Sequence, residues 1–328
     1  MAIVLSPSML LAALALAVVL LAGVGWTAAQ MGVSAASRHP LAGQARIGAE
    51  ATDLAADLDN AITRGELFLV HQPKVRSRTG AIEGVETLVR WRHPTNGLIG
   101  PGDFIGIAEQ HGAIRRLTEW VIRQTLVEQR ALAEAGHRLG CSVNISAFLL
   151  ADREFARWAL DPIRTACAPI GLEITETAMI AEPAGALANL HLLADAGIRI
   201  AIDDYGAGLS SLAYLKQLPA QELKIDRMFV QSLSTSHRDP LLVRSTIDLA
   251  HALGMEVTAE GVDSAAAMAL LKVMGCDLMQ GYLIAKPLLA GELADFLDAR
   301  RDRGVEAPEP MLFPWPAGAT LPARPAAG

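Results

Sequence analysis

The sequence predicts an α/β fold, a modified (β/α)8 barrel in which the first two strands pair antiparallel. Six short apolar runs each end on a carboxylate, an amide or an ammonium group, as in Ile200-Ala201-Ile202-Asp203-Asp204. Such runs are typical of the buried strands of a parallel sheet, and segments with helical spacing of apolar residues separate most of them. Residues 50–303 have the length of one barrel domain, for which about 250 residues is usual.

The first two predicted strands are joined by a link that is too short for a helix. Apolar residues at helical spacing predict a helix over residues 50–64 that leads into the domain. A strand over residues 67–72 follows, and a tight turn at Arg78-Thr79-Gly80 connects it to a strand over residues 82–90. Because parallel strands need a longer crossover connection, this pair should be antiparallel.

Strands and helices alternate through the rest of the domain. We expect strands over residues 141–145, 172–174, 199–202, 222–224, 256–259 and 278–282, and helices over residues 114–135, 148–165, 182–196, 209–216, 240–253, 264–274 and 290–301. Eight strands, most of them followed by a helix, make a closed α/β barrel the simplest arrangement.

The N-terminal segment is strongly apolar. The first 37 residues carry no charged side chain, and the run from Met9 to Trp26 has about the length of a membrane-spanning helix. Three interpretations are open: a membrane anchor, a cleaved signal peptide and a buried core helix. No basic residue precedes the apolar run, which argues against a signal peptide, and a buried helix rarely stays uncharged for so long. We therefore expect a transmembrane anchor over residues 1–30 and a linker over residues 31–49.

The charges and the composition of the chain indicate where the protein lies and which partners it has. Arg38 and Arg46 are the first charges after the apolar run, and positive flanks stay in the cytoplasm. We therefore expect a single-pass protein of the bacterial inner (cytoplasmic) membrane with its barrel in the cytoplasm. Residues 304–328 are rich in Pro and Ala and should be disordered. The net charge of −7 gives no sign of a surface for a DNA or RNA polymer, and the three cysteines form neither a disulfide framework nor a metal-ligand pattern.

Polar side chains stand at the ends of the predicted strands. In a strand–helix barrel the carboxyl ends of the strands open at one face, where catalysis takes place. That face would carry Glu86, Asn144, Glu173, Asp203, Asp204 and Glu260, together with Lys224. So many hard oxygen ligands around one opening would repel one another without cations between them, so the sequence predicts a metal site.

Nine short motifs follow one another through the domain. They are Gln72-Pro73-Lys74, Glu86-Thr87-Leu88-Val89-Arg90-Trp91, Pro101-Gly102-Asp103-Phe104-Ile105, Val143-Asn144-Ile145-Ser146, Glu173-Ile174-Thr175-Glu176, Asp203-Asp204-Tyr205-Gly206-Ala207-Gly208, Leu223-Lys224-Ile225-Asp226, Ala259-Glu260-Gly261-Val262 and Gln280-Gly281-Tyr282. Each alone is a weak signal. In this order and spacing, they make residues 50–301 resemble the EAL domain, the family of cyclic-di-GMP phosphodiesterases with a TIM-like barrel.

The resemblance implies a role for each residue of the site. Glu86, Asn144, Glu173 and Asp203 would bind a first metal, and Asp203 would bridge to a second metal bound by Asp204 and Glu260. Lys224 would lie near the attacking water, orienting it or helping to deprotonate it, with Glu86 and Glu260 also taking part in catalysis. The expected substrate-binding residues are Arg90, Gln72, Leu88 and Gln280, and Glu176 would support the loop that carries Asp204.

The sequence departs from the family pattern at four positions. Thr87 replaces Ala, Tyr205 replaces Phe, Ala207 replaces Thr and Asp263 replaces Glu. None of these changes removes an expected metal ligand. They therefore bear on the rate or regulation of the reaction more than on competence for it.

The expected function is hydrolysis of cyclic-di-GMP to 5'-pGpG by a water that two divalent cations, Mg²⁺ or Mn²⁺, activate. A catalytically weak or inactive receptor and signalling module for cyclic-di-GMP and a different metal-dependent phosphodiesterase are the alternatives. No Gly-Gly-Asp-Glu-Phe-like motif is present, so there is no sign of a cyclase domain. The resemblance also implies a homodimer that pairs near residues 209–218.

Overall fold

Eight strands close into a barrel, and their carboxyl ends bring the polar residues together. The computed structural model describes residues 54–302 except 56, 167, 176–182 and 207–211. These residues belong to the second of two units, which divide the chain at residue 50. The barrel strands are β1 (Leu67–Arg76), β2 (Ile82–His93), β4 (Gly140–Asn144), β5 (Ile170–Thr175), β6 (Arg199–Tyr205), β7 (Glu222–Ile225), β8 (Glu256–Ala259) and β9 (Leu278–Met279).

Strand β1 runs against the direction of its neighbours, as predicted. The strands follow the order β1-β9-β8-β7-β6-β5-β4-β2, and pairing of β1 with β2 closes the ring. β1 is antiparallel to β2 and β9, whereas β2 and the strands from β4 to β9 pair parallel. The register places Gln72 opposite Glu86, which brings two of the sequence motifs together. The short strand β3 (Gly97–Ile99), which the sequence did not predict, extends β2 as a hairpin.

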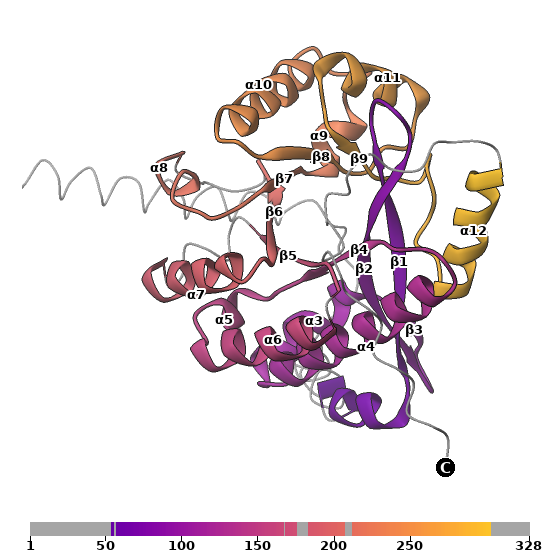
Figure 1. Cartoon of the computed structure of the whole chain (residues 1–328), viewed down its shortest axis with the longest axis vertical. Helices are drawn as coiled ribbons and strands as arrows, with labels where there is room; N and C mark the ends of the chain where they lie inside the picture. The colour runs from indigo at the N-terminus through magenta and orange to yellow at the C-terminus, as the bar shows by residue number, and fades with distance from the viewer. Residues whose placement is uncertain (1–53, 56, 167, 176–182, 207–211, 303–328) are drawn as a thin grey trace, which may run out of the picture. The chain divides into compact units, whose positions relative to one another are not determined.

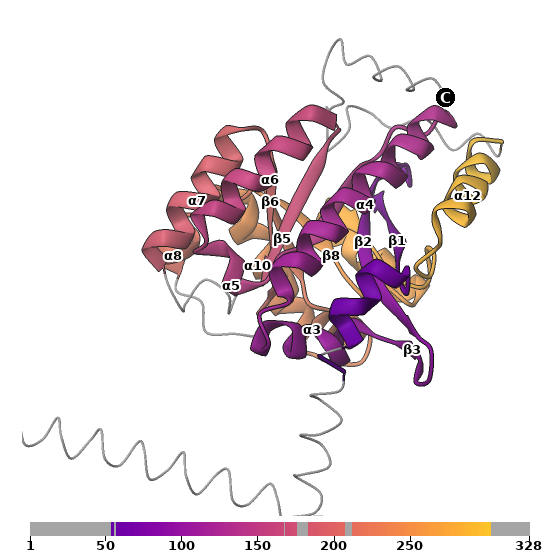
Figure 2. The same cartoon turned by 90° about the horizontal axis from the view of Figure 1, so that it is seen from below.

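Helices surround the barrel on its outside (Figure 1, Figure 2). Residues 54–64 form the expected leading helix, apart from residue 56, which is not described. The others are α3 (Pro101–Gln110), α4 (Ile114–Glu134), α5 (Ala147–Leu150), α6 (Arg153–Ala166), α7 (Pro183–Asp195), α8 (Leu212–Leu215), α9 (Arg227–Gln231), α10 (Asp239–Ala252), α11 (Ala265–Met274) and α12 (Ala290–Asp302). Helices α3 and α9 were not predicted.

The single helix expected over residues 148–165 is two helices. Asp152 lies between α5 and α6, and its Oδ1 accepts hydrogen bonds from the backbone nitrogens of Glu154 at 2.8 Å and Phe155 at 3.1 Å. An aspartate in this position satisfies the free N–H groups at the start of a helix. Asp152 is therefore a signal in the sequence for the break, although the apolar residues keep a helical spacing across it.

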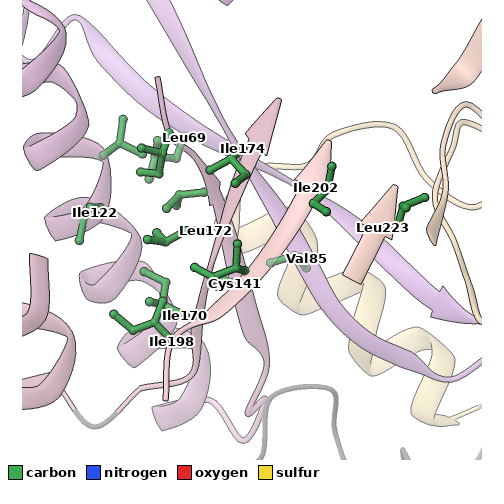
Figure 3. Packing of buried hydrophobic residues seen from close by; sticks show 14 of the residues in the cluster. Leu69, Val85, Ile122, Cys141, Ile170, Leu172, Ile174, Ile198, Ile202 and Leu223 are labelled. Atoms are coloured by element: carbon green, nitrogen blue, oxygen red, sulfur yellow. The ribbon is translucent and has the colours of Figure 1, made fainter. Parts of the chain in front are cut away.

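Branched aliphatic side chains pack between the barrel and its helices. Figure 3 shows this packing, in which Leu69, Ile122, Leu172 and Ile202 take part. Continuous burial of strand residues such as those of β5 is expected where helices cover the outside of a parallel sheet. This rigid frame fixes the strand ends that carry the polar residues.

The predictions for the two ends of the chain fall outside the described residues. The expected anchor over residues 1–30, the linker and the tail over residues 304–328 therefore remain predictions. Within the described part of the chain, no helix combines the length and the apolar character needed to cross a membrane.

Replacing Gly281 by alanine should destabilise the barrel next to the candidate site. A Cβ atom at Gly281 would lie 2.2 Å from the backbone nitrogen and oxygen of Val262. Overpacking of this kind costs about 1–3 kcal/mol, and urea denaturation should show a loss of that size. The control is Gly106→Ala in α3, where a Cβ meets nothing within 4 Å. That variant should be at least as stable as the parent, and a Gly281→Ala protein of parental stability would contradict the prediction.

Candidate metal centre

The strand ends bring five carboxylates into two clusters that share one residue. Ligand oxygens of Glu86, Glu173 and Asp203 lie within 4.8 Å of one another, and so do those of Asp203, Asp204 and Glu260. Glu86, Glu173 and Asp203 are buried. The structure thus places the carboxylates expected at the first and second metal positions in that same grouping.

Two amide side chains orient the carboxylate of Glu86. Asn144 donates from Nδ2 to Oε1 at 2.9 Å, and Gln280 donates from Nε2 to Oε2 at 2.5 Å. Gln280 also donates to Oε1 of Gln72 at 3.0 Å, and Gln72 donates to the carbonyl oxygen of Ala285 at 3.1 Å. Gln72 and Gln280, expected to bind substrate, therefore belong to one network with the Glu86 carboxylate.

Lys224 lies at the centre of the carboxylates. Its Nζ is 2.7 Å from Glu260 Oε1, 3.0 Å from Asp203 Oδ1 and 3.5 Å from Glu86 Oε2. It also donates to Oε2 of Glu173. The side chain is fully buried. Burial alone would lower the pKa of Lys224, but the surrounding carboxylates outweigh it and hold the pKa well above the ordinary value.

The carboxylates differ in their tendency to ionise. Burial raises the pKa of Glu173, but the charges of Lys224 and Lys74 outweigh it and lower that pKa to about 2. Burial raises the pKa of Glu86, and it raises the pKa of Glu260 to about 8. Burial and the charge of Asp203 raise the pKa of Asp204 to about 6. Glu260 and Asp204 therefore ionise less readily than Glu173.

The backbone of Asp204 lets adjacent aspartates serve one cluster. Asp204 has a φ of 55°, and no other non-glycine residue in the described part of the chain has a positive φ. The β6–β7 register also shifts between Ile202 and Tyr205. An irregularity of this kind redirects side chains that would otherwise point to opposite faces. Gly206, two residues further on, also has a positive φ, of 101°.

A second buried lysine, Lys74, lies beneath the cluster and has no role predicted from the sequence. Nζ of Lys74 is 2.8 Å from Glu173 Oε1, 2.9 Å from Glu222 Oε1 and 3.2 Å from Ser142 Oγ. Thr258 donates to the same Glu222 oxygen at 2.6 Å. The alternation of side chains along the strands could have indicated that Lys74 and Glu222 face the barrel interior. Lys74 is two residues from Gln72, and Glu222 is two residues from Lys224, so each pair shares a face of its strand.

The donor set fits two divalent cations. With Glu222 counted, six carboxylates face two ammonium groups, and full ionisation leaves a formal charge of −4 that two divalent cations would neutralise. Carboxylate and amide oxygens are hard ligands of the kind that Mg²⁺ and Mn²⁺ prefer. Glu86, Asn144, Glu173 and Asp203 would hold one cation, and Asp203, Asp204 and Glu260 the other.

The remaining substrate-binding candidates lie beside the cluster. Leu88 and Asn144 line a cavity of about 450 Å³ together with Phe148 of α5. Arg90 is half-buried on β2 and donates from Nη1 to the carbonyl oxygen of Val89 at 2.8 Å. Burial lowers the pKa of Arg90. Glu176, the expected loop support, lies outside the described residues.

Three of the four departures from the family pattern lie in the described part of the chain. Oγ1 of Thr87 is 3.1 Å from Nδ1 of His71, in the wall of the barrel. Asp263 is exposed, and Tyr205 is half-buried at the end of β6. Ala207 lies outside the described residues. The hydroxyl of Thr87 is thus engaged with His71 of the neighbouring strand β1.

Comparison with known proteins places this architecture in a family. The chain is similar to the cyclic di-GMP phosphodiesterase NbdA of Pseudomonas aeruginosa, with 39% identity over 249 residues that make up 75% of this chain and 32% of NbdA. It is 34% identical to the cyclic di-GMP phosphodiesterase RocR of the same organism over 244 residues, 74% of this chain and 62% of RocR. The chain thus spans only about a third of NbdA.

A solved structure and a family model agree with these relatives. The structure described as "PaMucR Phosphodiesterase, c-di-GMP complex" matches with a TM-score of 0.70 and 37% identity, covering 74% of this chain and 99% of that one. The family model described as "EAL domain" matches residues 55–287. The resemblance that the motifs indicated is confirmed, and the chain belongs to the EAL domain family.

Proposed function

We propose that this chain hydrolyses cyclic-di-GMP to linear 5'-pGpG as a metal-dependent phosphodiesterase. The observation that carries the proposal is the pair of carboxylate clusters that share Asp203 at the carboxyl ends of the barrel strands. The relatives named as cyclic di-GMP phosphodiesterases support the substrate, as does the similar structure that contains c-di-GMP. Mg²⁺ or Mn²⁺ would neutralise the charge of the phosphodiester and activate the attacking water.

The protein side chains would orient the reacting groups. Asn144 and Gln280 hold both oxygens of Glu86 in fixed directions. Lys224 stays protonated because the carboxylates around it raise its pKa, so its role is to donate hydrogen bonds and supply charge. This favours the orienting role over deprotonation of the water. Arg90 on β2 would contact a phosphate oxygen of the substrate.

The receptor alternative is less well supported. A module that binds the nucleotide without turnover has no need of a complete ligand set. The described residues nevertheless include all six expected metal ligands, which are the five carboxylates of the two clusters and Asn144 beside Glu86. The chain therefore offers what hydrolysis requires.

Two further parts of the proposal rest on the sequence. Attachment to the inner membrane, with the barrel in the cytoplasm, rests on the uncharged first 37 residues and on Arg38 and Arg46. A homodimer that pairs near residues 209–218 rests on the family resemblance, and part of that segment lies outside the described residues.

Hydrolysis of cyclic-di-GMP by the full chain tests the proposal. With Mg²⁺ or Mn²⁺ we expect 5'-pGpG, and with a chelator we expect none. Glu86→Ala should lose about a hundredfold or more in rate, as when one electrostatic group is removed from an active site. Glu134→Ala at the end of α4 is the control and should retain the parental rate. Tight nucleotide binding without product would instead favour the receptor.

Lys224→Met should make the stability of the barrel depend on cations. Removing one member of a buried ion pair costs about 3–5 kcal/mol, because the partner charges stay buried. We expect the melting temperature of this variant to fall in chelator and to recover with Mn²⁺, while the rate of hydrolysis falls about a hundredfold. Lys272→Met on the exposed side of α11 should change neither quantity. Parental turnover by Lys224→Met would exclude a role for the lysine in the reaction.

Cation binding should release protons near neutral pH. Without a cation, Glu260 with a pKa of about 8 is mainly protonated at neutral pH, and Asp204 with a pKa of about 6 is partly so. A cation binds only the ionised forms, so its apparent affinity should rise as the pH rises toward 8. Calorimetry at pH 7 in two buffers of different ionisation enthalpy measures the release. Glu260→Gln should release fewer protons, and heats that do not depend on the buffer would contradict the prediction.

A further inference from the structure

The barrel interior beneath the metal cluster contains a second polar layer. Such interiors are usually filled by branched aliphatic side chains, whereas here Lys74, Ser142, Glu222 and Thr258 are buried together. Lys74 has no exposed surface, and its cross-strand neighbour Gly84 has no side chain. The absence of a side chain at Gly84 therefore leaves room for the buried side chain of Lys74.

Lys74 and Lys224 divide the two oxygens of Glu173 between them. Lys74 donates to Oε1 at 2.8 Å, and Lys224 donates to Oε2. Oε2 of Glu173 therefore faces Lys224 and the carboxylate cluster, whereas Oε1 of Glu173 faces Lys74 and the second polar layer. Glu173 can then offer the cluster one oxygen in a fixed direction, and not both.

Lys74 is itself held in place by a chain of contacts. Glu222 accepts from it at 2.9 Å, and Thr258 donates to the same Glu222 oxygen at 2.6 Å. Ser142 on β4 adds a contact at 3.2 Å. Direct contacts from β4 and β7 thus hold the ammonium group of Lys74 next to Glu173, and β8 contributes through Thr258, which holds Glu222.

We propose that Lys74 is a positioning residue for metal binding, which holds Glu173 as a one-oxygen ligand of the first cation. The inference rests on the proposed function only in requiring that the cluster binds divalent cations. Residues that hydrogen-bond to metal ligands set their orientation, and losing one typically costs about 10–100-fold in metal affinity.

The sign of the effect separates positioning from two simpler roles. A lysine that acted only through its charge would repel a nearby cation, so its removal would tighten metal binding. A lysine that only stabilised the fold would change the melting temperature and leave the metal affinity unchanged. A positioning lysine strengthens metal binding in spite of its charge.

The test is Mn²⁺ binding to the full chain, measured by the electron paramagnetic resonance of free Mn²⁺. Lys74→Met combined with Glu222→Gln removes one positive and one negative charge, so the net charge of the barrel is kept. We expect the Mn²⁺ dissociation constant to rise about 10–100-fold. The matched control is Arg244→Met with Asp248→Asn, which removes an exposed ion pair on α10 and should leave the constant unchanged.

Each outcome decides the proposal. Binding as tight as that of the parent, or tighter, overturns it, and so does a parent chain that binds no Mn²⁺. If the methionine variant does not fold, Lys74→Gln with Glu222→Gln takes its place. The glutamine side chain is shorter than that of lysine and cannot keep the contacts to both Glu173 and residue 222. A weaker Mn²⁺ affinity of this variant therefore supports the proposal, and parental affinity overturns it. A parent that binds Mn²⁺ without hydrolysing cyclic-di-GMP would count against the proposed function alone.

Discussion

The balance of buried charge is the constraint on which the rest of the site depends. Carboxylates taken out of water are costly unless they are paired and hydrogen-bonded. Lys224 reaches four of them and Lys74 reaches Glu173 and Glu222, yet two ammonium groups do not balance six carboxylates. Burial first, and the charge of neighbouring carboxylates such as Asp203 after it, raise the pKa values of Glu86, Glu260 and Asp204. The barrel is therefore built to take up positive charge from outside.

The reversed first strand explains how amide and ammonium groups reach both levels of the barrel. Because β1 is antiparallel to β2, Gln72 lies opposite Glu86 at the level of the cluster, and Lys74 lies opposite Gly84 one layer deeper. A parallel β1 would need a crossover helix in place of the turn after Arg76. The reversed first strand thus places Gln72 at the level of the cluster and Lys74 in the layer below it.

The parts of the fold and site that the sequence predicted follow from local patterns. Apolar runs and short links were enough for the barrel and for the antiparallel first pair, and carboxylates at strand ends were enough for the cluster. Lys74 and Glu222 were not found because a charge inside a strand is usually a solvated one, and its burial depends on partners far along the chain. The positive φ of Asp204 had no such local signal, because glycine is the default residue for that conformation.

The two halves of the cluster differ in how firmly the protein holds them. Both oxygens of Glu86 accept bonds from amides, and both oxygens of Glu173 accept bonds from lysines. Preorganised ligands of this kind need little rearrangement when a cation binds. Asp204 instead relies on a backbone conformation that costs about 1–3 kcal/mol in a non-glycine residue. Because surrounding contacts must offset that cost, the second position depends on the β6–β7 irregularity, whereas the first depends on side chains deep in the barrel.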